Sequence, residues 1–262
     1  MKQKFFLPAL LTLAVFTASA QKITLGIRGG ISIPNLSANG SVNNPLNTGY
    51  SSRTGPDFAA FLKYHLSDNF SIQPMLEYSA QGGKKNGFQA LPTPAELAPL
   101  FDPGPVPLYL YADYNSTAKI NYLMIPVLGR FDWPLAKKSP CSFYAAAGPF
   151  AGFLLSAKQV TSGSSLLYLD PGGTQPLPAP ANSFDATTDI KDQLHTMNFG
   201  LCATVGFSYS FGNNSIFVEG GGNYGLLNIQ KGTDNGKNQT GAAVVGVGYS
   251  YTLSKSKSSG KK

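Results

Sequence analysis

The chain has 262 residues, of which 42% are hydrophobic and 13% are charged, and its formal net charge is +7. Soluble globular domains are about 25% charged, so this composition does not fit a typical soluble surface, and it is too apolar for a disordered chain. Six of the 20 lysines and arginines lie in the first four or the last eight residues. The body of the chain is therefore nearly neutral, which excludes a basic face for nucleic acid.

Residues 1–20 have the pattern of a secretory signal peptide. Two lysines precede an apolar stretch at residues 5–16, and the small residues Ala18-Ser19-Ala20 form a cleavage site before Gln21. A buried N-terminal helix is the alternative, which this pattern fits less well. No apolar run of 18 residues follows Ala20, so no membrane-spanning helix is expected after it.

From Lys22 onward, apolar side chains alternate with polar or small ones at every second position. Successive side chains of a β-strand point to opposite faces, so each alternating segment predicts a strand with one apolar face. The alternation is clear in residues 22–33, 57–66, 70–81, 196–209 and 243–253, and weaker in 117–131, 142–158 and 216–229. In the segment 117–131, Asn121 and Arg130 fall on opposite phases, so we expect a β-bulge there.

The connections between these eight segments alternate between short and long. Turn-forming residues occupy the short ones, at Ser67–Asn69, Asp132–Pro140 and Gly212–Asn214. The long ones are Pro34–Ser52, Gly83–Ser116, Gln159–Gln193 and the shorter Lys231–Thr240. Transmembrane β-barrels have short periplasmic turns and longer extracellular loops. The sequence therefore predicts an all-β fold, an eight-stranded antiparallel up-and-down transmembrane β-barrel that spans residues 21–253.

The apolar face of the predicted strands is expected to contact lipid. A soluble barrel around a ligand is the alternative, but it needs a charged outer face, and the chain has too few charges for one. Aromatic residues near strand ends are typical of girdles at the membrane interfaces. The predicted girdle residues are Tyr64, Tyr78, Phe131, Tyr209, Tyr249 and Tyr251. We expect a monomer in the cell outer membrane of a Gram-negative envelope, surrounded by outer-membrane lipid.

Several segments resemble the PorT-like outer-membrane β-barrel family. They are Lys22–Ser37 (KITLGIRGGISIPNLS), Tyr122–Arg130 (YLMIPVLGR), Phe143–Lys158 (FYAAAGPFAGFLLSAK) and the chain end around Tyr249 and Tyr251. The resemblance spans nearly all of residues 21–253 and implies an eight-stranded outer-membrane barrel without catalytic residues. The chain departs from the family pattern by continuing for nine residues after the aromatic end.

The lumen is expected to hold a network of charged side chains formed by Arg28, Lys63, Glu77, Arg130 and Glu219. Buried charges persist when they are paired. Counting residues from the periplasmic strand ends places Arg28 level with Glu77, and places Glu219 nearer to Lys63 and Arg130. The network then forms a salt-bridged plug, with a polar path for a small ion as the alternative. Side chains fill an eight-stranded interior, so bulk transport is not expected.

We expect no catalytic site, no cofactor and no metal site. The histidines, His65 and His195, belong to opposite ends of the predicted barrel, and the chain has no Gly-x-Ser-x-Gly or His-x-x-x-His motif. Asp185, Asp189 and Asp192 lie close together in a long loop, where they either bind Ca²⁺ or are simply solvated.

The two cysteines, Cys141 and Cys202, are expected to be free thiols. The predicted hairpin register sets them about eight residues, or roughly 26 Å, apart along the barrel wall. A disulfide needs Cα atoms within about 7 Å of each other.

Function is expected to lie in the long extracellular loops. Loops longer than about 12 to 15 residues are usually functional or disordered. In the loop Gly83–Ser116, apolar residues such as Leu97, Leu100 and Phe101 favour either a contact surface or packing of the loops on one another. The sequence therefore predicts a noncatalytic outer-membrane barrel, structural or binding a protein or glycan partner. A barrel that binds a small ligand or modifies lipid is the alternative.

Residues 254–262 carry four lysines after the last predicted strand. We expect a disordered, basic periplasmic tail, and contact of this tail with anionic cell-wall polymer is the alternative.

Overall fold

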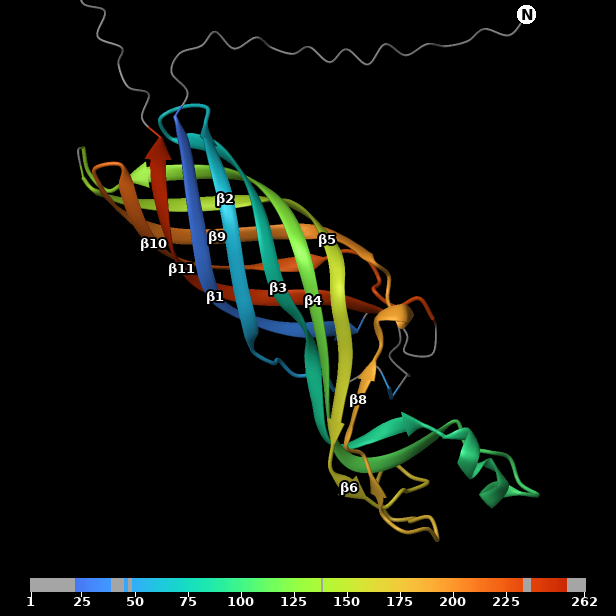
Figure 1. Ribbon diagram of the computed structural model, residues 1–262. Coiled ribbons are helices and arrows are strands. Elements are labelled where there is room, and N and C mark those ends of the chain that lie inside the picture. Colours follow the sequence, from blue (N-terminus) through green and yellow to red (C-terminus); the bar gives the residue numbers. More distant parts are fainter. Residues whose placement is uncertain (1–21, 39–44, 47–48, 138, 233–236, 254–262) are drawn as a thin grey trace, which may run out of the picture.

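The computed structural model describes residues 22–38, 45–46, 49–137, 139–232 and 237–253 (Figure 1). The predicted signal peptide and the predicted basic tail, residues 1–20 and 254–262, lie outside these ranges. Within them, no helix is both long enough and apolar enough to cross a bilayer.

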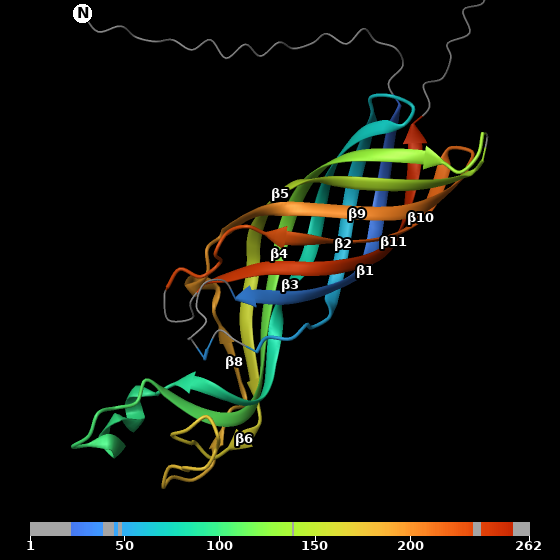
Figure 2. The ribbon, with the colours of Figure 1, turned by 180° about the vertical axis from the view of Figure 1, so that it is seen from behind.

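Eight long antiparallel strands close into a barrel (Figures 1 and 2), which confirms the predicted fold class. The ring runs in the order β4-β3-β2-β1-β11-β10-β9-β5, and pairing of β4 with β5 closes it. The long strands are β1 (Ile23–Ala38), β2 (Gly55–His65), β3 (Phe70–Pro92), β4 (Tyr109–Pro134), β5 (Cys141–Ser162), β9 (Met197–Phe211), β10 (Asn214–Gly225) and β11 (Asn238–Leu253).

Five short elements lie in the connections. They are the 3-10 helices η1 (Ala95–Phe101) and η2 (Lys191–Gln193) and the short strands β6 (Ser164–Ser165), β7 (Asn182–Ser183) and β8 (Ala186–Asp189). Strand β8 pairs with the end of β5, and β6 pairs with β7.

The two ends of the barrel differ in their connections. The tight β2–β3, β4–β5 and β9–β10 turns lie at the end where β1 begins and β11 finishes, and Ile23 pairs there with Leu253 (Figures 1 and 2). We call this the turn end. The longer connections lie at the opposite, loop end, so the predicted alternation of short and long connections is present.

The outer wall is apolar, and the lumen side of most strands is polar or small. In β1, for example, Thr24, Arg28 and Ser32 are buried in the lumen, whereas Ile27 and Ile31 are exposed on the wall. Aromatic residues gather on the wall near the turn end, where rings 4.7 to 6.0 Å apart run across β3, β4, β5 and β9. These rings belong to Phe70, Phe131, Trp133, Phe143 and Phe207. Of the predicted girdle, Phe131, Tyr209, Tyr249 and Tyr251 are exposed on this wall.

The predicted irregularity in 117–131 is present as a shift of the β4–β5 register between Asn121 and Tyr122. Asn121 pairs with Ser156 and Tyr122 with Leu154, so the extra residue, Leu155, belongs to β5 and not to β4. Arg130 consequently keeps the lumen phase of Tyr122, and its side chain is buried.

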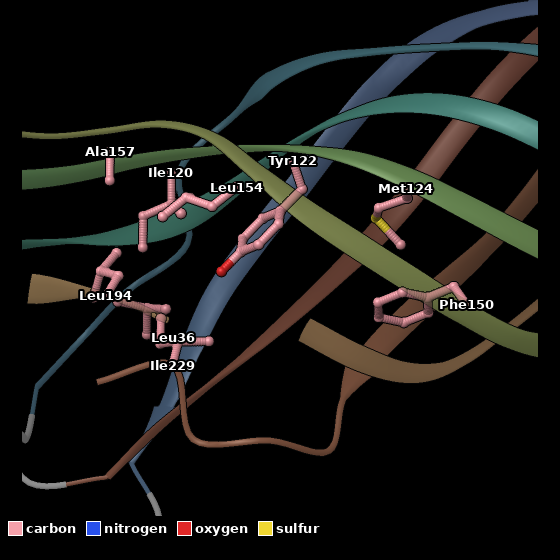
Figure 3. Close-up of a cluster of buried hydrophobic side chains, with 9 residues drawn as sticks. All are labelled: Leu36, Ile120, Tyr122, Met124, Phe150, Leu154, Ala157, Leu194 and Ile229. Atoms are coloured by element: carbon pink, nitrogen blue, oxygen red, sulfur yellow. The ribbon is translucent and has the colours of Figure 1, made fainter. Parts of the chain in front are cut away.

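Two apolar clusters pack inside the lumen at different levels. One lies toward the loop end, where side chains from the strands meet Leu194 and Ile229 of the connections (Figure 3). Its members are Leu36, Ile120, Tyr122, Met124, Phe150, Leu154, Ala157, Leu194 and Ile229. The other lies nearer the turn end and contains Ala59, Phe61, Met75, Leu128, Tyr144, Ala146 and Phe217. Both clusters fill the barrel interior with side chains, as expected for eight strands.

Strands β3, β4 and β5 continue past the rim of the barrel and form a projecting arm (Figures 1 and 2). We define the arm as residues 83–116 and 159–185. The prediction of loops at Gly83–Ser116 and Gln159–Gln193 is wrong in part, because β3 and β4 remain paired as far as Pro92 and Tyr109. Gly82, with φ +114°, lies where β3 leaves the barrel, and a Cβ atom there would lie 2.0 Å from the Ala118 carbonyl oxygen.

Candidate functional site

Arg28 lies at the centre of the lumen and contacts three carboxylates from three other strands. Its Nη2 is 2.5 Å from Asp57 Oδ1 and 3.1 Å from Glu77 Oε2, and its Nη1 donates to Glu219 Oε1 at 2.7 Å. None of the four side chains is more than 7% exposed. These residues, which we call the central charge cluster, tie β1, β2, β3 and β10 together across the barrel.

Hydroxyl groups and glycines complete the central charge cluster. Tyr144 donates a hydrogen bond of 2.6 Å to Glu219, and Ser79 donates one of 3.1 Å to Asp57. A Cβ atom at position 206 would lie 2.4 Å from the Tyr144 hydroxyl oxygen, so Gly206 makes room for that ring. The cavity beside Arg28 measures about 30 Å³, which is enough for one or two water molecules and far too narrow for a wide channel.

A second cluster lies closer to the turn end and consists of Lys63, Arg130 and Asp132. Arg130 donates to Asp132 from Nε and, at 2.8 Å, from Nη2, and its guanidinium lies 3.5 Å above the Tyr144 ring. Lys63 Nζ is 3.7 Å from Asp132 Oδ2. We call these three residues the turn-end charge cluster; Tyr144 contacts both clusters.

The structure places all five predicted charged residues in the lumen, but the predicted partners of Glu219 are wrong. Glu219 pairs with Arg28, whereas Lys63 and Arg130 share Asp132. Strands of a barrel are tilted, so residues at equal counts from the strand ends lie at different heights, and counting misplaced Glu219.

Sequence reasoning missed two members of these clusters. Asp57 occupies the same alternating phase as Lys63 in β2, which was an available signal for a lumen position. Asp132 was assigned to a turn, but β4 extends to Pro134 and carries it into the lumen.

The arm at the loop end has an apolar core of its own. Leu110 and Ala112 of β4 are fully buried against Leu167 and Leu177, with partly buried residues of η1 and β3 around them. Aromatic pairs extend this core, because the Tyr114 and Phe184 rings stack 4.5 Å apart. Leu97 and Phe101, the apolar residues noted in the sequence, also pack against this core. Packing of the loops on one another therefore accounts for these two apolar residues.

The base of the arm is joined to the β1–β2 connection. Arg53 donates from Nε and Nη2 to the Gln81 carbonyl oxygen, at 3.0 and 2.6 Å, and Lys85 Nζ donates to the Pro45 carbonyl oxygen at 2.8 Å. Burial lowers the pKa of Lys85 and raises the pKa of Tyr50, which lies beside it. The contact of Lys85 holds the arm against the rim of the barrel, and the contacts of Arg53 hold β3 just below the arm.

The far part of the arm exposes apolar side chains. Leu108 is 80% exposed, Leu100 is 54% exposed and Val106 is 46% exposed. None of the three belongs to the core of the arm, and together they form what we call the arm tip.

A closed ring of eight strands with an apolar outer wall and a packed lumen that holds charged side chains is the architecture of a small membrane barrel. The family described as the outer membrane protein beta-barrel domain matches residues 19–231. The chain belongs to this family. The match ends before β11, which the structure pairs with β1 and β10 to complete the barrel.

Membership of the outer membrane protein beta-barrel domain family locates the chain in the outer membrane. Short turns of such barrels face the periplasm, so we expect the turn end on the periplasmic side and the arm on the extracellular side.

Solved structures of outer-membrane barrels are similar to the chain at low identity. Neisserial surface protein A is 14% identical, with 87% of this chain and 96% of that chain covered and a TM-score of 0.37. OprG from Pseudomonas aeruginosa is 12% identical, with 89% and 95% covered and a TM-score of 0.39. The attachment invasion locus protein Ail of Yersinia pestis is 12% identical, with 87% and 98% covered and a TM-score of 0.35. No curated protein sequence matches the chain.

The other candidate residues of this outer-membrane barrel lie apart from one another. His65 contacts Thr24 at the periplasmic end, and His195 is at the extracellular end, just before β9. Asp185 accepts from the Gly163 amide, and Asp189 accepts from the Lys191 amide. The described part of the chain contains no group of three or more acidic, histidine or cysteine side chains that could hold a metal ion.

Both cysteines are free in the structure, as predicted. On the β5–β9 ladder Cys141 pairs with Tyr209 and Cys202 with Gly148, so they lie at different heights of the wall.

Proposed function

We propose that this protein is a noncatalytic outer-membrane barrel that presents its arm to a protein or glycan partner outside the cell. The observation that carries the proposal is the arm itself, which has its own apolar core and a base fixed to the rim of the barrel. A minimal barrel needs no such extension. A stiff extension with an exposed apolar tip is suited to contact with a partner.

The lumen supports a structural role and not a catalytic or conducting one. The charged side chains of the central charge cluster are engaged with one another, and the cavity beside Arg28 measures about 30 Å³. The two histidines are at opposite ends of the barrel, so they do not form a common acid–base site.

We further propose that the chain belongs to the PorT-like group of outer-membrane barrels of Gram-negative envelopes and is exported by a signal peptide at residues 1–20. The segments that resemble this group form β1, β4, β5 and the end of β11, so their Gly and aromatic pattern serves the barrel wall and lumen. The group assignment therefore adds no catalytic residue.

A small-ligand function is the second candidate, because a cavity of about 220 Å³ lies at the extracellular mouth between the barrel and the arm. Tyr50, Tyr114, Gln89 and Gln159 line it, which supplies aromatic faces and amide groups for a small polar molecule. No comparable observation supports lipid modification.

Trimming the arm tests the main proposal. One variant replaces residues 86–115 and residues 163–185 each by a short Gly-Ser turn. Asn86 and Asn115 are paired, so the first turn joins two neighbouring strand positions. We expect normal outer-membrane assembly and a nearly unchanged melting temperature. Binding of surface-displayed protein to arrays of extracellular proteins and glycans should be lost.

A point variant separates the arm tip from the mouth cavity. Leu108→Ser changes an exposed side chain of the arm tip, and Gln159→Ala changes the cavity lining. Loss of array binding in Leu108→Ser alone supports a macromolecular partner at the tip, and loss in Gln159→Ala alone supports the small-ligand alternative. Retention of binding in the trimmed variant would refute the proposal.

A further inference from the structure

A polar vestibule occupies the periplasmic end of the lumen, opposite to the arm. Its volume is about 210 Å³, and cationic side chains of Lys22, Lys63 and Arg130 line it. Hydroxyl groups contribute much of the remaining lining, among them those of Ser208 and Ser250. The vestibule has no part in the proposed function of the arm, so its own role needs a separate explanation.

Positive charge exceeds negative charge in this vestibule. Lys63 and Arg130 share one carboxylate, that of Asp132, and Arg130 forms the hydrogen bonds to it. Lys63 Nζ, at 3.7 Å from Asp132, lies beyond hydrogen-bond distance although its side chain is only 13% exposed. An ammonium group has three donors, for which water or an anion in the vestibule can supply acceptors.

The remaining charged groups of the vestibule lie at its rim and do not cancel its excess of positive charge. Lys22 and Asp68 line it with opposite charges, and both are exposed. His65 also lines it and shares a hydrogen bond of 3.1 Å with Thr24. Together the lining has three lysine or arginine cations and two carboxylates.

The negative central charge cluster lies behind an apolar layer. Phe61 and Phe217, whose rings are 5.8 Å apart, line the vestibule and pack in one cluster with Met75 and Leu128. Met75 and Leu128 in turn line the small cavity beside Arg28. The surplus carboxylates of the central cluster are thus separated from Lys63 by packed side chains.

We propose that the vestibule is a binding site for a small oxyanion, a carboxylate or phosphate group, with Lys63 as its main ligand. Bonds between an ammonium donor and such an anion are short and strong, and the serine hydroxyls can donate further ones. The anion balances the charge that Lys63 and Arg130 leave after sharing Asp132. The bound carboxylate or phosphate belongs to a free anion, to the end of a peptide chain or to a lipid headgroup, and it enters the vestibule from the periplasm.

Titration of the intact barrel with simple anions tests this proposal. The protein is kept in a maltoside detergent, which carries no phosphate, at constant ionic strength set with sodium chloride. Inorganic phosphate, acetyl-trialanine with a free carboxylate and the corresponding amide are added separately. A ligand that binds only the folded state raises the melting temperature. We expect phosphate, the peptide acid or both to raise it, and the neutral amide to leave it unchanged.

Comparing the separate titrations identifies the source of the anion. A rise with phosphate alone supports phosphate carriers, and a subsequent rise with vesicles of phosphatidylglycerol over phosphatidylcholine points to lipid headgroups. A rise with the peptide acid alone supports chain ends. No rise with either anion, or an equal rise with the amide, overturns the proposal.

Three variants connect the effect to Lys63. Lys63→Met should weaken the apparent affinity about tenfold or more, the size expected for losing a charged hydrogen bond. Lys137→Met changes an exposed lysine in the β4–β5 turn at the same end and should leave it unchanged. If Lys63→Met does not fold, Asp132→Asn serves instead, because removing the competing carboxylate should strengthen anion binding. Equal loss in both lysine variants, or no gain in Asp132→Asn, contradicts the proposal.

Discussion

The lumen and the arm are two packed interiors that share strands β3, β4 and β5 but differ in chemistry. At the level of Arg28 the lumen is held by four charged side chains, whereas the arm is held by Leu110, Ala112 and their apolar neighbours. Below the rim the outer wall is apolar, and the interior holds two charge clusters beside apolar ones, whereas the interior of the arm is apolar. A barrel in a bilayer can place charged side chains only in its interior, whereas an element surrounded by water buries apolar ones.

Strand β4 contributes to both interiors along a single phase of alternation. Its even-numbered residues face inward throughout, from Leu110 and Ala112 in the arm to Ile120 and Leu128 in the barrel and finally to Arg130. The stability of the lumen should therefore depend on charge pairing as well as on apolar packing, and that of the arm on apolar packing alone. Substitutions can separate the two contributions.

The largest effect is expected for Arg28→Met, which leaves Asp57, Glu77 and Glu219 buried without their common cation. Breaking a buried pair by removing one partner costs about 3 to 5 kcal/mol in the free energy of unfolding, and water entering the lumen reduces that cost. Urea titration of the barrel in lipid vesicles measures it. Glu77→Gln is the matched control, because Arg28 keeps two carboxylates; equal costs for both variants would show that the charges are already solvated.

A smaller and local effect is expected for Leu110→Ala in the core of the arm. Removing a fully buried leucine side chain costs about 2 to 5 kcal/mol, but here the cost should open the arm and leave the barrel closed. Limited proteolysis should cut within residues 83–116 while the melting temperature of the barrel stays unchanged. Leu108→Ala, at an exposed position, should change neither. A fall in the melting temperature of the barrel would mean that the arm and the barrel unfold as one unit.

The smallest effect is expected for Tyr144→Phe, which removes the hydrogen bond to Glu219 and keeps the ring below Arg130. Hydrogen bonds to charged groups contribute about 1.5 to 3 kcal/mol. Urea titration should give a loss below that of Arg28→Met. A loss as large as that of Arg28→Met would assign the main stabilising role to Tyr144 and not to the ion pairs.

The sequence predicted the barrel well because strict alternation is a local signal. Residues 22–33 and 196–209 carry it without interruption, and the turn residues at Ser67–Asn69 and Gly212–Asn214 mark the β2–β3 and β9–β10 turns. The lumen charges followed from the same phase. The contact of Arg28 with Glu77 followed too. The partners of Glu219, Lys63 and Arg130 did not, because partner choice depends on strand tilt and on the true end of β4, which brings Asp132 inside.

The arm was not predicted, because its pairing is a tertiary property. Residues 82–90 (GGKKNGFQA) contain three glycines and no regular alternation, so nothing local marks them as part of β3. They are strand because β4 lies beside them as far as Tyr109. Proline-rich sequence around η1 strengthened the expectation of a loop.

Pairing of β1 with β11 has a consequence for how the protein is made. The first and last described strands are neighbours, with Ile23 opposite Leu253, so the ring cannot close until the chain has been made and exported as far as β11. Until then β1 presents an unpaired edge along which other chains can add. Closure between strands so far apart in sequence is slow. During biogenesis β1 must therefore be kept from pairing with other chains until β11 is present.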